Sequence, residues 1–288
     1  MSFATRFAPS PTGLLHKGHA FSALTAWQAA RQAGGRFVLR MEDGDFTRCR
    51  PEYEAAILDD LRWLGLSWEE PVLRQSERRE VYDGALERLR DMGVLYRCFR
   101  TRAEVLALAG GAPHESDPRD TRRPGPHPPD EEAALLAEGR PFAWRLSLER
   151  ASAHLGGFSH LSWTEDGHGP RPCDPAALKA LGDMVVGRKD IGVGYVIASV
   201  IDDAAQGITH VIRGEDLREI TLIQRVLQAL LDLPAPVYSH HRLILAPDGR
   251  RLAKRDRDET LAAMRARGIS AAALRKELGE ELGVQAPD

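Results

Sequence analysis

The stretch from Pro9 to His19 constrains the fold of this chain more than any other, because a short strand there turns directly into a helix. Alternating apolar residues over Thr5–Ala8 predict a buried strand. Two prolines and a glycine then break the strand into a turn. Helical spacing begins near His16, and the pair Gly34-Gly35 provides a stop signal. We therefore expect a strand–turn–helix unit at the N-terminus.

The start of this helix offers a site for phosphate groups. Unpaired backbone N–H groups and the positive end of the helix dipole attract anions there. His16 and His19 add donors, whose interaction with a triphosphate strengthens as charge builds in a transition state. Gly18 carries no side chain, so that a flat purine can lie close to the backbone. The pattern predicts a turn that holds a nucleoside triphosphate.

The same run resembles the signature of a known family. His16–His19 is similar to the His-x-Gly-His motif with which class I aminoacyl-tRNA synthetases bind ATP. Arg6–Gly13 resembles the opening of the glutamyl and glutaminyl branch of that family. The resemblance implies a Rossmann-like catalytic domain that uses ATP, with Mg²⁺ bridging the phosphates, and a catalytic role for both histidines. The ATP contacts that it implies in this run are Pro9, His16, Gly18 and His19.

The composition is typical of a soluble globular protein. Of the 288 residues, 43% are apolar and 28% are charged, and no apolar run is long enough to span a membrane. The N-terminus lacks a basic-then-apolar leader, and three widely spaced cysteines argue against a disulfide framework. We therefore expect a cytoplasmic protein without a membrane partner. The net charge of −3 neither indicates nor excludes nucleic-acid binding, because a local basic stripe suffices.

Strand-like and helical runs alternate over the first part of the chain. Such alternation predicts an α/β fold whose parallel sheet has right-handed crossovers. Ligands bind such sheets at the carboxyl ends of the strands, which is where the Pro9–His19 turn and Glu42 fall. The expected elements are strands over Arg36–Met41 and Val94–Tyr96 and helices over 52–64 and 78–92.

Prolines and glycines crowd residues 110–129, which therefore cannot sustain a helix or a central strand. We interpret this region as part of an α+β subdomain inserted between the two halves of the nucleotide-binding fold. Short strands are expected in it over Phe142–Leu148 and Phe158–Trp163. Regular patterns return over Tyr195–Val200, Ile208–Arg213, a helix at 215–231, a strand at Val237–Leu245, and helical runs at 258–266 and 270–281.

These observations predict four parts. Residues 1–96 form the first half of the nucleotide-binding fold, and residues 97–185 form the inserted subdomain, which the resemblance identifies as the acceptor or connective subdomain. Residues 186–256 form the second half, and residues 257–288 form a short helical tail without an anticodon-binding domain.

A basic segment, Arg251–Arg255, follows the turn at Asp248-Gly249. It is similar to the mobile Lys-Met-Ser-Lys-Ser loop of the family, with Ala253 in place of the serine. Lys254 keeps the ammonium group that would offset charge on the β- and γ-phosphates. By itself such a run is typical of a solvated loop. The resemblance implies a catalytic role for Lys254 and ATP contacts from Arg251, Leu252 and Lys254.

A site for an acidic amino acid needs fixed cations for the side-chain carboxylate and a carboxylate for the ammonium group. Arg6 and Arg213 can supply the cations, and Glu42 can supply the carboxylate. Each lies in a run similar to a motif of the family. The glutamate contacts that the resemblance implies are Arg6, Ala8, Ser10, Glu42, Tyr195 and Arg213.

The sequence departs from the family at its zinc site. Relatives often carry Cys-x-Cys here, whereas this chain has Cys98 followed by Phe99 and Arg100. Structural zinc takes four protein ligands, and the spacing of Cys98 from His114 and His127 matches no familiar pattern. A single buried cysteine usually packs as a small hydrophobe. We therefore expect no zinc and no other protein-bound metal.

The segment after the basic loop is too short for an independent anticodon reader, since residues 256–288 allow two short helices. A synthetase core of this shape resembles the glutamyl-queuosine tRNA(Asp) synthetase family. The resemblance implies L-glutamate, ATP and queuosine-modified tRNA(Asp) as partners of an enzyme that we expect to be monomeric.

The expected activity is that of an ATP-dependent glutamate-activating ligase. Glutamate would first form glutamyl-adenylate, and a hydroxyl of the queuosine cyclopentenediol would then take the glutamyl group. The alternatives are a truncated glutamyl-tRNA synthetase that charges tRNA(Glu), a small-molecule nucleotidyltransferase, and a non-catalytic module that binds amino acid or RNA. A nucleotidyltransferase shares the ATP fold but does not explain Arg6, Glu42 and Arg213. The altered loop Arg251–Arg255 is the only feature that favours the non-catalytic, synthetase-like module.

Overall fold

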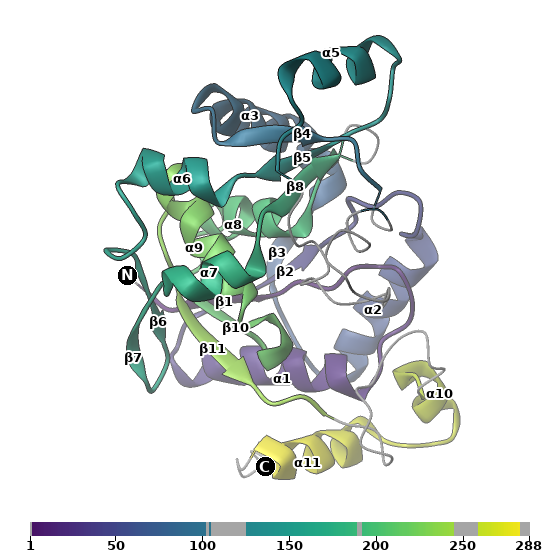
Figure 1. The fold of residues 1–288 in the computed structure, drawn as a ribbon. Helices are drawn as coiled ribbons and strands as arrows, with labels where there is room; N and C mark the ends of the chain where they lie inside the picture. The colour runs from purple at the N-terminus through teal and green to yellow at the C-terminus, as the bar shows by residue number, and fades with distance from the viewer. Residues whose placement is uncertain (1, 102–103, 105–124, 189–191, 245–258, 283–288) are drawn as a thin grey trace. The chain divides into compact units, whose positions relative to one another are not determined.

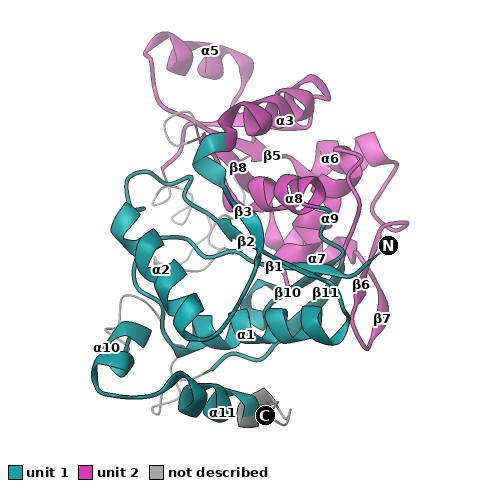
Figure 2. Ribbon diagram, turned by 180° about the vertical axis from the view of Figure 1, so that it is seen from behind, with its two compact units in different colours: residues 1–77, 207–217, 237–288 teal, residues 78–206, 218–236 magenta. Residues whose placement is uncertain are grey.

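The computed structural model describes residues 2–101, 104, 125–188, 192–244 and 259–282 (Figure 1). Its contacts divide the chain into two compact units (Figure 2). Unit 1 comprises Met1–Glu77, Gly207–Leu217 and Val237–Asp288, and unit 2 comprises Arg78–Gln206 and Arg218–Pro236. The division into residues 1–96, 97–185, 186–256 and 257–288 stays a prediction.

Unit 1 is built on parallel strands, as the sequence predicts. Its three-stranded sheet has the order β1-β2-β3, with Ala4 to Phe7 opposite Arg36 to Leu39. A parallel pair, β10 and β11, continues beside β1, where the N–H of Thr209 donates to the carbonyl of Ala4 at 2.9 Å. The strands are β1 (Ala4–Phe7), β2 (Arg36–Met41), β3 (Glu69–Arg74), β10 (His210–Gly214) and β11 (Val237–His241).

Small side chains bring the first helix close to these strands. Helix α1 contacts β1, β2 and β10 through a buried face that includes Ala20, Ala23 and Ala26. Leucines from several elements complete the core, and each contributes about 1.5–3 kcal/mol when fully buried. The helices of unit 1 are α1 (Lys17–Gln32), α2 (Pro51–Trp63), α10 (Leu261–Ala266) and α11 (Ala271–Leu282). Two 3-10 turns are η1 (Gln75–Arg78) and η3 (Glu215–Leu217), and η1 ends at the first residue of unit 2.

Unit 2 contains an antiparallel sheet of order β4-β5-β8-β9 and a hairpin of β6 with β7. Buried Asp202 joins α8 to α3, because it accepts hydrogen bonds from the Tyr82 hydroxyl and from Arg78 Nε, both at 2.8 Å. The elements are α3 (Arg79–Asp91), β4 (Leu95–Cys98), α5 (Pro129–Ala137), β5 (Ala143–Leu146), α6 (Leu148–Leu155), β6 (Ser162–Glu165), β7 (Gly169–Pro172), α7 (Pro175–Leu181), β8 (Met184–Arg188), β9 (Gly192–Val193), α8 (Tyr195–Ala205) and α9 (Ile220–Leu230).

Several predicted elements have different bounds in the structure. The strand expected over Phe142–Leu148 is β5 and ends at Leu146, and the strand expected over Val237–Leu245 is β11 and ends at His241. The strand expected over Phe158–Trp163 begins only at Ser162, because the Leu161 N–H donates to the Phe158 carbonyl in a turn. The helix expected over 215–231 is a 3-10 turn followed by α9 from Ile220. Among the residues that the structure describes, no helix combines the length and the apolar character needed to cross a bilayer.

Candidate functional site

The two histidines of the N-terminal motif cap helix α1. His16 is the N-cap residue, and its Nδ1 accepts a hydrogen bond from the Gly18 N–H at 3.1 Å. In return, Nδ1 of His19 accepts from the His16 N–H at 3.2 Å. The rings lie with their centroids 3.8 Å apart. Because Nδ1 is the acceptor in both rings, each neutral ring carries its proton on Nε2.

The turn before this helix is tied to the neighbouring strand. The N–H of Glu42, directly after β2, donates to the carbonyl of Pro9 at 3.0 Å. Pro9 is buried, whereas Ala8 and Ser10 are half-buried. The predicted ATP contacts Pro9 and His16 therefore belong to one rigid turn at the carboxyl end of β1.

Thr260 forms an isolated antiparallel bridge with His16, and the Leu261 N–H donates to the Leu15 carbonyl at 2.9 Å. The chain thus returns to the helix start directly after the basic segment. The predicted ATP contacts in that segment, Arg251, Leu252 and Lys254, lie outside the described residues.

Three charged residues predicted to bind glutamate lie at the carboxyl ends of neighbouring strands. Arg6 lies in β1, Glu42 follows β2 and Arg213 lies in β10. β1 pairs with β2 and contacts β10, so all three residues belong to one edge of unit 1. Arg6 and Arg213 are each only 5% exposed, and the side chain of Glu42 is 9% exposed.

The two arginines are held by neutral acceptors. Arg6 Nη1 donates to the carbonyl of Ile212 at 3.2 Å. Arg213 donates through Nη2 to the carbonyl of Leu217 at 3.2 Å and through Nε to His240 Nε2 at 3.3 Å. Each of these hydrogen bonds to a neutral acceptor helps to orient its guanidinium group.

A third, fully buried arginine lies beside the predicted ammonium site. Arg40 Nη2 donates to Glu42 Oε1 at 3.4 Å. Buried charges are retained in proteins where they have partners of opposite charge. Three buried guanidinium groups and the Glu42 carboxylate therefore lie at this edge of unit 1, which are the two kinds of charge that a dicarboxylic amino acid needs.

Sequence reasoning missed two histidines at the end of β11. His240 accepts from Arg213, and His241 Nε2 lies 2.6 Å from Ser22 Oγ of α1. Burial lowers the pKa of His241. The polar run Ser239–Arg242 inside the strand expected over Val237–Leu245 was the signal that could have identified them.

The remaining predicted residues lie in unit 2. Tyr195 is the first residue of α8 and is half-buried. Cys98 ends β4 and is buried. Arg100 donates to the carbonyl of Gly125 at 3.2 Å. Within the described part of the chain, no group of three or more histidine, cysteine or acidic residues could hold a metal ion.

The fold and this site define a class of protein. A family described as the class I tRNA synthetases (E and Q), catalytic domain, matches residues 2–280. A glutamate tRNA ligase from Elizabethkingia meningosepticum, solved in complex with its amino acid, superposes with a TM-score of 0.69 at 31% sequence identity. That match covers 89% of this chain and 52% of the ligase.

The share of each relative's length that the match covers distinguishes two branches of this class, the glutamyl-Q tRNA(Asp) synthetases and the glutamate–tRNA ligases. A glutamyl-Q tRNA(Asp) synthetase from Rhodobacter capsulatus is 46% identical over 291 residues, which cover 96% of this chain and 99% of that protein. A glutamate–tRNA ligase from Synechococcus is 40% identical, but the match covers only 57% of its length. The chain belongs to the glutamyl-Q tRNA(Asp) synthetase family of class I tRNA synthetases.

Proposed function

We propose that this chain activates L-glutamate with ATP and transfers the glutamyl group to the queuosine base in the anticodon of tRNA(Asp). The observation that carries the proposal is the placement of Arg6, Arg213 and Glu42 on the same strand edge that bears the capped start of α1. Similarity over nearly the full length of a glutamyl-Q tRNA(Asp) synthetase supports the choice of acceptor. In this proposal the enzyme acts as a cytoplasmic monomer.

Glutamate recognition assigns one role to each charge. Arg6 and Arg213 hold the γ-carboxylate, and Glu42 accepts from the α-ammonium group. Ala8, Ser10 and Tyr195 line the pocket in this proposal. Held in this way, the amino acid presents only its α-carboxylate for reaction.

In the first step an oxygen of the α-carboxylate attacks the α-phosphorus of ATP. A carboxylate–phosphorus bond forms, the bond to the β-phosphate breaks, and pyrophosphate leaves with the electron pair. Nε2–H of His16 and His19 and the ammonium of Lys254 stabilise the charge that develops on the phosphates. Mg²⁺ bound to ATP would neutralise part of the same charge.

In the second step a hydroxyl of the cyclopentenediol attacks the carbonyl carbon of the adenylate. An ester bond forms, the bond from the carbonyl carbon to the phosphate oxygen breaks, and AMP leaves. The hydroxyl proton passes to a phosphate oxygen of AMP or to water. The mixed anhydride supplies the reactivity, so no general base of this chain is assigned.

The test compares acceptors. Radiolabelled glutamate, ATP and Mg²⁺ are incubated with queuosine-containing tRNA(Asp), queuosine-free tRNA(Asp) and tRNA(Glu). Each tRNA is used intact and after removal of its 3′-terminal adenosine, because a label on queuosine does not require that nucleotide. We expect label on queuosine-containing tRNA(Asp) in both forms.

Two other results would contradict the proposal. Label confined to intact tRNA(Glu) would identify a synthetase that charges the terminal adenosine. No label on any RNA, together with no glutamate-dependent pyrophosphate exchange, would identify a module that binds without catalysis.

A further inference from the structure

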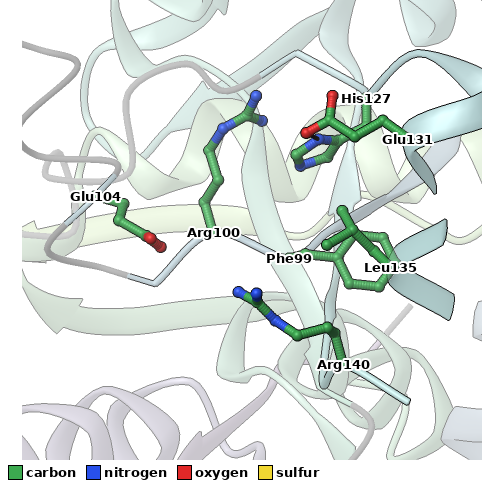
Figure 3. A pocket seen from close by; sticks show the side chains of 7 residues that line it. All are labelled: Phe99, Arg100, Glu104, His127, Glu131, Leu135 and Arg140. Atoms are coloured by element: carbon green, nitrogen blue, oxygen red, sulfur yellow. Dashed lines mark ion pairs between the residues drawn. The ribbon is translucent and has the colours of Figure 1, made fainter. Parts of the chain in front are cut away.

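A hollow of about 510 Å³ in unit 2 has no part in the chemistry above (Figure 3). Its volume lies in the usual range of small-molecule sites, about 300–1,000 Å³. None of its residues is among those proposed to bind ATP or glutamate. They follow β4 or belong to α5 and its two ends, and are Phe99, Arg100, Glu104, His127, Glu131, Leu135 and Arg140.

His127 is the buried polar group of this hollow. Its side chain is 5% exposed, and its ring points into the hollow (Figure 3). Among the described residues neither ring nitrogen has a hydrogen-bond partner. Glu131 Oε1 lies 2.9 Å from Nδ1, close enough for an ion pair with a protonated ring but off the direction that a hydrogen bond needs. A polar group buried in this way favours a ligand that supplies the missing partner.

Two guanidinium groups face the same hollow. Arg100 is oriented by its hydrogen bond to the Gly125 carbonyl at 3.2 Å. The side chain of Arg140 makes no hydrogen bond or ion pair with any described residue, and it is exposed. Hydrogen bonds from Thr101, followed by the charges of Arg140 and Arg100, lower the pKa of Glu104, so both arginines act on one carboxylate. Two arginines and a histidine around one space are suited to a phosphate group.

The hollow also has an apolar wall and two carboxylates. Phe99 and Leu135 lie on the side opposite Glu104 (Figure 3). Phe99 is held edge-on by His127, with ring centroids 5.7 Å apart at an interplanar angle of 77°. Unpaired bases are recognised by aromatic and apolar contact with their faces and by hydrogen bonds to their edges. Glu104 and Glu131 can accept such bonds from the amino groups of a base.

We propose that this hollow binds one nucleotide, with its base against Phe99 and Leu135 and its phosphate facing Arg100, Arg140 and His127. Phosphate alone would leave the apolar wall and the two carboxylates without a function, and an apolar ligand would leave the buried ring of His127 without a hydrogen-bond partner. A free nucleotide and an unpaired nucleotide of a bound RNA share this chemistry.

The test measures binding to the full-length protein by titration calorimetry without ATP, so that the titrated ligand is the only nucleotide present. The ligands are 5′-GMP, 5′-CMP, inorganic phosphate, a single-stranded RNA hexamer and the same hexamer in a duplex. Arg140→Gln and His127→Gln remove two of the proposed contacts. Arg171→Gln, on the exposed face of β7, makes the same charge change outside the hollow and serves as the matched control.

We expect Arg140→Gln and His127→Gln to weaken nucleotide binding by about tenfold or more, because each removes a charge-assisted or buried hydrogen bond. Arg171→Gln leaves binding unchanged. A loss seen with GMP and CMP supports the proposal with a free nucleotide as ligand. A loss seen only with single-stranded RNA supports it with an RNA nucleotide as ligand.

Equal affinities of all three variants for every ligand would overturn the proposal, as would phosphate binding as tightly as GMP. Because Arg140 is exposed, its substitution keeps the test decisive even if His127→Gln unfolds the protein. The experiment measures nucleotide binding and not transfer of glutamate. A negative result would therefore overturn this proposal without contradicting the proposed function.

Discussion

His16 and His19 cap the same helix by exchanging roles, since Nδ1 of His16 accepts from the Gly18 N–H and Nδ1 of His19 accepts from the His16 N–H. These bonds satisfy two N–H groups that a helix start otherwise leaves without intrahelical partners. They also orient both rings and place the proton of each neutral ring on Nε2. Helix stability and the proposed phosphate contacts therefore depend on the same two side chains.

Substitutions at His19 can separate these contributions. Glutamine retains an acceptor for the His16 N–H at this helix position, whereas alanine does not. We expect His19→Gln to keep the free energy of unfolding within about 0.5 kcal/mol, while His19→Ala loses about 1 kcal/mol. Both should lower the rate of glutamate-dependent pyrophosphate exchange by about 100-fold, because both remove a donor to developing charge. Urea unfolding and exchange assays measure the two effects. Normal exchange by His19→Gln would show that this histidine only caps the helix.

Arg213 and His240 should affect glutamate binding more than the chemical step. We expect Arg213→Ala to raise the KM for glutamate by about 100-fold or more, since a buried charge contact to the γ-carboxylate is lost. His240 orients Arg213 through Nε2, at 3.3 Å from Arg213 Nε, and we place it as a positioning residue. His240→Ala should raise KM about tenfold with little change in kcat, and His240→Gln, which retains an acceptor, should restore most of the affinity.

A matched control for these variants is Arg36→Ala. Arg36 of β2 forms an ion pair with Glu69 of β3, but both side chains are about half exposed. This ion pair therefore contributes little to stability. Kinetic constants of Arg36→Ala should equal those of the unsubstituted enzyme. A kcat loss without a KM change in Arg213→Ala would contradict the assignment of Arg213 to the γ-carboxylate.

The hydroxyl of Tyr82 should stabilise unit 2 through Asp202. This carboxylate is completely buried, and burial together with the Asp202 charge raises the pKa of Tyr82. Tyr82→Phe removes a donor to a buried carboxylate, and we expect a loss of about 1.5–3 kcal/mol. Tyr53→Phe removes a half-buried hydroxyl that has no hydrogen bond to a described residue and should leave the melting temperature unchanged. Equal melting temperatures for the two variants would show that the hydrogen bond from Tyr82 to Asp202 does not stabilise unit 2.

The N-terminal half of the site was predictable because its signals are local. The alternation over Thr5–Ala8, the turn and the cap residues lie within fifteen residues, and β1 and α1 confirm them. β3 was missed because Glu69–Arg74 contains a proline and only two apolar residues after it, as is typical of a strand at a sheet edge. The strand propensity of the residues is weak evidence for a strand in such a segment.

Contacts between distant segments could not be read from the sequence. Arg213 and His240 meet because β10 and β11 pair in parallel, with Arg213 opposite His240. Phe99 and His127 line one hollow although β4 and α5 are far apart in the chain. Such partners are set by register and packing, and local periodicity carries no information about either.

Asp60 of α2 gives the pH dependence of stability that is most easily tested. It is buried, neither carboxylate oxygen has a hydrogen bond among the described residues, and Arg265 of α10 lies 3.7 Å away. Burial raises the pKa of Asp60 to about 6, and the charge of Arg265 opposes that rise only in part. A folded-state pKa above the unfolded value means that the folded protein holds the proton more tightly.

Stability should therefore fall as pH rises from about 4 to about 6 and then level off. A shift from 3.8 to about 6 corresponds to a loss of up to about 3 kcal/mol over this window. Asp60→Asn cannot ionise, so its free energy of unfolding should exceed that of the unsubstituted protein at pH 7.5, and its slope between pH 4 and 6 should be smaller by the Asp60 contribution. Asp59→Asn changes the charge of the neighbouring side chain, which is 65% exposed, and should retain most of the slope. Urea unfolding at half-unit pH intervals measures these slopes. Parallel curves for Asp60→Asn and Asp59→Asn would show that Asp60 ionises normally and that its pairing with Arg265 compensates for burial.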